Sequence, residues 1–86
     1  MQALEKLIDE TKSYMIAEKD MDMAKMYYAD WKDFNQVDEL VTGGSFQAAS
    51  DFINGMDTSP REQAVLALAE EKGSAWVANY LGWEVA

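Results

Sequence analysis

The 86-residue sequence contains no cysteine and no histidine. Without cysteine it can form no disulfide, no thiol nucleophile and no thiolate metal site. Without histidine it lacks the usual general base and the residue that activates a catalytic serine. No glycine-rich phosphate-binding loop is present either. We therefore expect a protein that is not an enzyme and that binds neither a cofactor nor a metal ion.

Carboxylates alone do not suggest a catalytic or metal site. Three pairs of acids are adjacent in the sequence: Asp9-Glu10, Asp38-Glu39 and Glu70-Glu71. Adjacent residues of a helix point in different directions, so these pairs do not converge, and they are typical of a solvent-facing surface. Asp20 and Asp33 each begin a stretch that resembles the start of a calcium loop. Neither stretch has the glycine at its sixth position or the glutamate at its twelfth that such a loop needs.

Basic residues are scarce, with 7 lysines and arginines against 16 acids, a net charge of -9 and a pI of about 4.2. Proteins bind nucleic acids and anionic membranes through lysine and arginine. This composition therefore argues against direct contact with either. The long-range attraction of the chain is toward a protein with a basic surface, although acidity also serves simply to keep a small protein in solution.

Long apolar runs are also missing. No window approaches the roughly 18 apolar residues of a membrane-spanning helix, and the acidic N-terminal stretch has no signal-peptide pattern. We expect a soluble, cytoplasmic protein, in the host cytoplasm if it is encoded by a phage. A chain of this length supports one small domain near the lower limit of independent stability, so we treat residues 1–86 as a single helical domain.

One proline and five glycines punctuate the chain. The glycines each follow a stretch with helical spacing, where a left-handed residue is expected. Ser59-Pro60-Arg61-Glu62 is typical of a helix start, with serine as N-cap, and Asn35 and Ser45 are further candidate N-caps. The predicted fold class is all-α, a compact bundle of about five to six short helices. The expected helices cover residues 2–18, 21–32, 36–42, 46–53, 60–72 and 74–81, and Trp83 and Val85 fold back as a tail.

Apolar residues at helical spacing predict the inward face of each helix. In the first helix this face holds Leu4, Leu7, Ile8, Thr11 and Met15. In the second it holds Met21, Ala24, Tyr28 and Trp31.

The interval between Lys32 and Arg61 contains acids and no base. Acids carried on short helices can present carboxylates at varied spacings, which is what imitation of nucleic-acid phosphates requires. In size, acidity and lack of cysteine the chain resembles bacteriophage anti-restriction and anti-CRISPR inhibitors. We therefore expect an inhibitor that mimics nucleic-acid charge. The candidate partner-binding residues are Asp30, Asp33, Asp38, Glu39, Asp51, Asp57 and Tyr27.

The stretch from Met26 to Phe34 holds four aromatic rings. Their spacing favours core packing, with Tyr27 or Phe34 left outside beside the acids as an interface anchor. An alternative function is a helical adaptor or regulatory subunit that binds its partner through a groove around Met23, Met26 and Tyr27. A homodimer formed by the first two helices is a third possibility.

Overall fold

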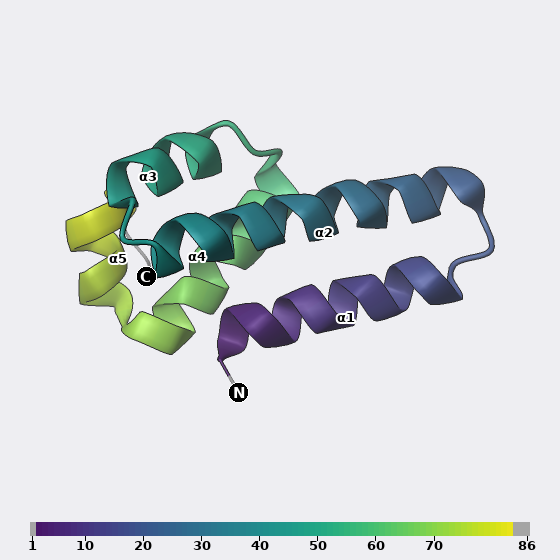
Figure 1. The fold of residues 1–86 in the computed structure, drawn as a ribbon, viewed down its shortest axis with the longest axis horizontal. Coiled ribbons are helices and arrows are strands. Elements are labelled where there is room, and N and C mark those ends of the chain that lie inside the picture. The colour runs from purple at the N-terminus through teal and green to yellow at the C-terminus, as the bar shows by residue number, and fades with distance from the viewer. Residues whose placement is uncertain (1, 84–86) are drawn as a thin grey trace.

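The computed structural model describes residues 2–83, and across that range the secondary structure is entirely helical, as expected (Figure 1). The two helices expected between residues 21 and 42 are one continuous helix. The five helices are α1 (Ala3–Ala17), α2 (Met21–Thr42), α3 (Phe46–Asn54), α4 (Thr58–Lys72) and α5 (Ser74–Leu81).

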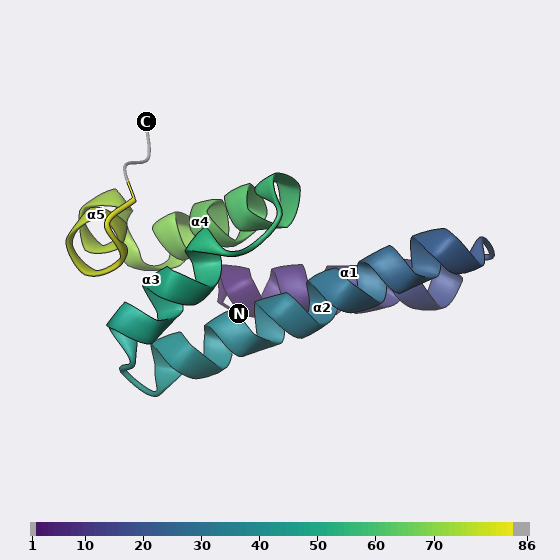
Figure 2. The same cartoon turned by 90° about the horizontal axis from the view of Figure 1, so that it is seen from above.

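Helices α1 and α2 form an antiparallel hairpin, and α3, α4 and α5 gather around the end of the hairpin that holds the N-terminus (Figure 1). Seen from above, α4 and α5 lie on one side of the hairpin, and the turn between α1 and α2 extends well beyond them (Figure 2). The molecule is accordingly elongated, with principal extents of 40 × 26 × 26 Å. One half of the hairpin is therefore part of the packed body, and the other half is covered by no other helix.

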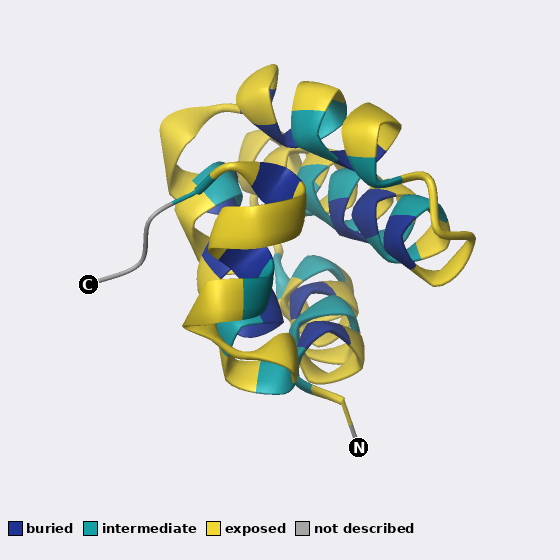
Figure 3. Cartoon of the chain, turned by 90° about the vertical axis from the view of Figure 1, so that its left-hand side faces the viewer, coloured by how far each residue is buried: buried dark blue, intermediate teal, exposed yellow. Residues whose placement is uncertain are grey.

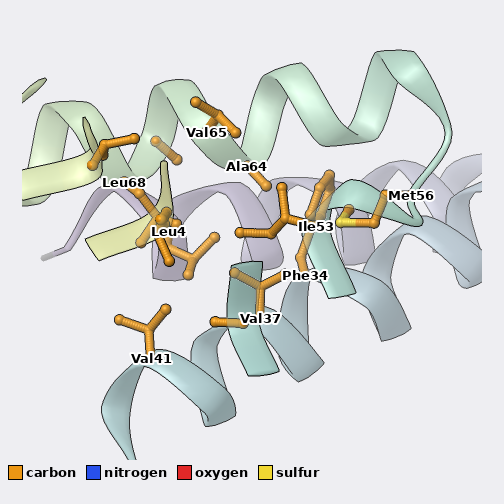
Figure 4. Close-up of a cluster of buried hydrophobic side chains, with 13 residues drawn as sticks. Leu4, Phe34, Val37, Val41, Ile53, Met56, Ala64, Val65 and Leu68 are labelled. Carbon is orange, nitrogen blue, oxygen red and sulfur yellow. The ribbon is translucent and has the colours of Figure 1, made fainter. Parts of the chain in front are cut away.

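Each helix turns its buried positions inward (Figure 3). Side chains from α1, α2, α3 and α4 point toward one another in the centre of the body (Figure 4). The expected inward positions of α1 hold, with Leu4 and Thr11 buried. The largest side chains that are almost wholly buried are Phe34, Leu4, Ile53, Leu68, Leu81, Val37 and Val77.

The inward face of α2 differs from the expected one. Met21 and Tyr28 were expected to face inward, yet they are 69% and 49% exposed. The buried residues of this helix are Phe34, Val37 and Val41. These three follow the 3,4 spacing of a helix that packs along one face, and they lie in the half of α2 that the other helices cover.

Asn35 does not start a helix. It lies inside α2, and its side chain donates a hydrogen bond to the carbonyl oxygen of Trp31 at 2.8 Å. Asparagine favours helix ends because its side chain competes for backbone groups, but burial on both sides of this position keeps the helix intact. The N-cap of the continuous helix α2 is Asp20. Its carboxylate accepts hydrogen bonds from the backbone N–H groups of Asp22 and Met23.

Helix α4 begins two residues earlier than expected. Its N-cap is Asp57 and its first residue is Thr58, so Ser59 is not the cap. Pro60 is tolerated as the third helical residue, because the first four N–H groups of a helix have no partner within it. The proline ring is itself buried, which ties the first turn of α4 to the body.

Only some of the glycines adopt the expected left-handed backbone. Gly44, Gly73 and Gly82 have positive φ angles of 76°, 95° and 71°. Gly43 and Gly55 follow their helices with right-handed φ angles instead. A side chain at Gly44 or Gly73 would be strained by the backbone even though it would meet no neighbour.

Trp83, the second residue after the end of α5, folds back as expected. Trp83 packs against the core, and the Arg61 guanidinium lies 5.4 Å from the centre of its ring. The other predicted tail residue, Val85, lies outside the described residues.

Candidate functional site

The continuity of α2 decides where its acids point. At about 100° per residue, positions nine apart lie on opposite sides of a helix, so Asp30 and Glu39 point in opposite directions. By the same rule Asp38 lies about 140° around the helix from Asp33. The acids that were predicted to act together therefore do not form one face. Asp30 and Asp33 share one side of α2, and Asp38 and Glu39 lie on other sides.

Two further acids approach Asp30 and Asp33 from elsewhere in the chain. Asp51 of α3 and Asp33 line the same shallow hollow, together with Phe52, Gly55 and Met56. Asp57, in the turn before α4, is close enough for its charge to act on both Asp30 and Asp33. We call Asp30, Asp33, Asp51 and Asp57 the acidic cluster. It unites four of the six predicted acids.

The negatively charged carboxylates of the acidic cluster repel one another. Partial burial raises the pKa of Asp30 above 3.8, and the neighbouring carboxylates of Asp33 and Asp57 raise it further. Partial burial and the charge of Asp57 likewise raise the pKa of Asp33, which the nearby ammonium group of Lys32 partly offsets. The cluster is thus a place where the folded chain concentrates negative charge at an energetic cost.

Few bases neutralise this charge. Arg61, one turn beyond Asp57, directs its guanidinium to Trp83 and donates to the hydroxyl of Thr58 at 3.5 Å. Asp51 accepts a hydrogen bond from the neutral Gln47 side chain at 3.1 Å. Within residues 2–83 the structure has one ion pair, Lys6 with Glu10 at 4.0 Å, which belongs to α1. The carboxylates of the cluster, of which Asp51 and Asp57 are exposed and Asp30 and Asp33 partly buried, therefore have no ion-pair partner in the described part of the chain.

Tyr27 lies beside the acidic cluster but is partly buried. Its ring centre is 5.9 Å from that of Tyr14 in α1. The two rings and Asp30 line a hollow between the hairpin and Gln63 of α4. Phe34, the other ring predicted to stay outside, is 1% exposed and belongs to the core.

The sequence did not predict most of a second surface, which consists of exposed apolar side chains on the free half of the hairpin. Tyr14 and Ile16 in α1 are 57% and 71% exposed, and together with Met21 and Tyr28 they lie around the free half of the hairpin. Tyr14 and Ile16 fall outside the inward positions of α1, which could have identified them as exposed. The exposure of Tyr28 could not be foreseen, because it depends on which side of α2 the later helices cover.

The described residues contain no group of three or more acids arranged to hold a metal ion. None of the helices in residues 2–83 is both long enough and apolar enough to cross a membrane. No protein-family model matches the chain, and the comparisons with curated proteins and with solved structures give no match either.

Proposed function

We propose that the protein is a non-enzymatic inhibitor that occupies the basic nucleic-acid groove of a partner protein. The acidic cluster carries this proposal, because it brings four carboxylates from three separate segments to one place. Each stands in for a phosphate. Lysines and arginines that normally displace counterions from a phosphate backbone are attracted by the same density of negative charge.

The energetics of the cluster favour a basic partner. Partial burial first, and the neighbouring carboxylates second, raise the pKa values of Asp30 and Asp33, so the charged groups also repel one another in the free protein. Lysine or arginine side chains of a partner relieve this repulsion and lower both pKa values. Binding near the raised pKa values therefore releases protons, and binding at neutral pH weakens as salt screens the charges.

This function matches that of small acidic phage proteins that block restriction or CRISPR enzymes, and the expected partner is an enzyme that processes DNA or RNA. Asp38 and Glu39 take a smaller part in binding, because α2 points them away from the cluster. Tyr27 lies at the margin of the surface, next to Asp30, where an aromatic ring serves as an anchor.

The test is a pull-down from a bacterial lysate with the tagged protein at low salt, followed by a salt gradient and mass spectrometry. We expect a nucleic-acid enzyme that elutes at moderate salt and that its own DNA or RNA displaces. The triple variant Asp33→Asn, Asp51→Asn, Asp57→Asn should abolish capture. A control variant with the same change in net charge, Asp22→Asn, Glu62→Gln, Glu70→Gln, should retain it. Equal loss in both variants would contradict a role for the cluster.

The alternative function, a helical adaptor, has its own support. Tyr14, Met23 and Met26 are exposed, and they lie near Tyr27 in the half of the hairpin that no other helix covers. Binding through this surface tolerates salt and has a negative heat-capacity change. Under this alternative, Tyr27→Ala weakens binding more than the triple acid variant does. Calorimetry with the captured partner measures the affinity of each variant.

A further inference from the structure

A groove runs between α1 and α4, which pack against each other in the body of the molecule (Figure 2). The two helices are antiparallel, since the backbone N–H of Leu4 donates to Oε1 of Glu71 at 3.3 Å near one end, and Glu10 and Gln63 line the groove together at the other. Its volume of about 670 Å³ lies within the range of about 300–1,000 Å³ that is typical of ligand-binding pockets. The groove is therefore large enough to receive side chains of a partner.

The groove continues into a second hollow, which lies between the α1–α2 hairpin and α4. Leu7, Glu10 and Gln63 line both hollows, so the two are continuous. The second hollow has a volume of about 370 Å³ and reaches Tyr14 of α1. From Ala3 to Tyr14, α1 advances by about 16 Å, which is the length of about three turns of a helix. We call the two hollows together the α1–α4 groove.

Apolar side chains form the deeper part of the α1–α4 groove. Ala67 is buried, and Ala3 and Leu7 are partly buried. Leu66 lines the groove with them and is 58% exposed, so it extends the apolar surface toward the solvent. A partner side chain that enters the groove therefore meets a strip of apolar residues.

Acidic side chains flank the apolar strip at both ends. Glu70 and Glu71 lie near the first turn of α1. Glu10 lies at the other end, and Asp30 follows it in the second hollow. Lys6 is the one base among the described residues that line either hollow, and its Nζ lies 4.0 Å from Oε1 of Glu10. The lining is therefore negative overall and complementary to a partner with basic side chains.

An amphipathic helix has the shape and the chemistry that fit this groove. A third helix can lie along two antiparallel helices at about 8–10 Å from the axis of each. Helices that bind in such grooves insert the apolar residues of one face. Here the apolar strip receives that face, and the acids at the two ends receive lysine or arginine side chains.

The spacing of the acids sets the spacing of the partner's basic residues. Glu71 is held beside Leu4 by a hydrogen bond, and Leu4 precedes Glu10 by six residues, or about 9 Å along α1. On a partner helix this distance separates residues that are about two turns apart. We propose that the α1–α4 groove binds an amphipathic helix of a partner protein, in which lysine or arginine residues two turns apart flank apolar residues.

This interface is distinct from the acidic cluster, although the groove reaches Asp30 at its far end. The apolar strip and the acids Glu10, Glu70 and Glu71 carry the proposal, and none of these residues belongs to the cluster. The proposal therefore does not depend on whether the protein inhibits a nucleic-acid enzyme, and the two can be tested separately.

Fluorescence anisotropy with three labelled synthetic peptides tests the proposal on the whole chain. Each peptide has about 18 residues, which is long enough to form a helix. The first carries leucines along one face, flanked by lysines two turns apart. The second has glutamate in place of lysine, and the third has the composition of the first with its leucines and lysines scattered around the helix. We expect binding of the first peptide alone.

Each other result with the peptides overturns the proposal. Binding of the second peptide as well as the first would mean that charge does not select the occupant. Equal binding of the first and third would mean that charge attracts any basic chain, whatever its apolar face. Absence of binding by the first peptide up to about 1 mM would mean that the groove does not accept a basic helix.

Substitutions in the chain locate the bound peptide. Leu66→Ser should weaken binding of the first peptide by about 10-fold or more, because a leucine contact is lost. Ile16→Ser is the matched control, since Ile16 is aliphatic, 71% exposed and outside the groove, and it should leave binding unchanged. The triple variant Asp33→Asn, Asp51→Asn, Asp57→Asn should retain binding. If that variant loses the peptide and Leu66→Ser keeps it, the site is the acidic cluster and the proposal is wrong.

Charge reversal produces a gain of binding that damage to the fold cannot imitate. Lys6→Glu removes the base from the groove and should strengthen binding of the first peptide several-fold at low salt. Lys25→Glu changes the net charge equally outside the groove and should strengthen it less. Equal gains would show that the peptide responds only to net charge. Sedimentation of the wild-type chain completes the test, because a dimer that Leu66→Ser dissociates would place a second copy in the groove instead of a partner helix.

Discussion

The carboxylate of Asp33 is destabilised in the folded chain by partial burial and by the charge of a neighbouring acid. It is partly buried, and Asp57 adds negative charge nearby. Replacing it with asparagine keeps the shape and removes the repulsion. We therefore predict that Asp33→Asn stabilises the folded chain at neutral pH, by up to about 1 kcal/mol for an interaction near the surface. Urea unfolding measures the change, and Glu62→Gln, an exposed acid outside the cluster, is the control.

The same residue predicts a dependence on pH. The fold raises the pKa values of Asp30 and Asp33 above 3.8, so the folded chain holds these protons more tightly than the unfolded chain. Their contribution to stability is most favourable below the ordinary pKa and is lost as pH rises through the raised values. The stabilisation by Asp33→Asn should thus grow between about pH 4 and pH 7. A constant difference between the variant and the wild type across this window would contradict it.

The aromatic stretch was predicted to pack in the core, with Tyr27 or Phe34 exposed as an interface anchor, and Phe34 belongs to the core. It is 1% exposed, so Phe34→Ala should leave a cavity and destabilise the fold by about 3–5 kcal/mol. Tyr28→Ala, in the same helix but half exposed, should cost less than about 1 kcal/mol. Thermal unfolding followed by circular dichroism compares them. Similar losses for both would place Tyr28 in the core and contradict the burial described above.

At the scale of helices, the sequence predicted the existence and type of most elements. The helix ends set by Gly43 and Gly55 and the break before Asp20 were foreseen, because glycine and polar residues act locally. The continuity of α2 was not foreseen. Asn35 is a reasonable N-cap when considered alone, and only the burial of Phe34 and Val37 on either side shows that the helix runs through it.

Proline substitution tests the continuity of α2. If a helix began after Asn35, Gln36 would be its first residue, where proline is tolerated. Within a continuous helix, Gln36→Pro removes a backbone hydrogen bond and should destabilise by about 3 kcal/mol or more. Thr58→Pro is the control, since Thr58 is the first residue of α4 and Asp57 before it is already extended. Equal tolerance of the two prolines in thermal unfolding would contradict a single α2.

At the scale of the whole molecule, the acidic cluster shows what sequence cannot supply. The sequence identified Asp33, Asp51 and Asp57 as uncompensated acids. Their approach depends on the path of the chain from α2 through α3 into α4, which places residues 24 positions apart near each other. Helical periodicity describes one element at a time, so it could not bring Asp51 and Asp57 to Asp33. With a helix boundary expected at Asn35, it also could not be carried from Asp33 to Asp38 and Glu39.

The net charge of -9 acts on the molecule as a whole. At about 0.01 M salt the screening length is about 30 Å, which exceeds the two shorter extents of 26 Å, so charges across the molecule repel one another. At about 0.15 M it falls to about 8 Å, and only neighbours interact. We predict that sodium chloride over this range raises Tm by several degrees, since about 1 kcal/mol corresponds to about 4–8 °C in a domain of this size.

The source of that stabilisation can be identified with the two triple variants already described. Both reduce the net charge by the same amount, and long-range repulsion depends on that total. The control variant at Asp22, Glu62 and Glu70 should therefore lose part of the salt effect. The cluster variant at Asp33, Asp51 and Asp57 should lose more, because close carboxylates repel most strongly. A Tm that does not change with salt in the wild-type chain would mean that its charges are too far apart to oppose folding.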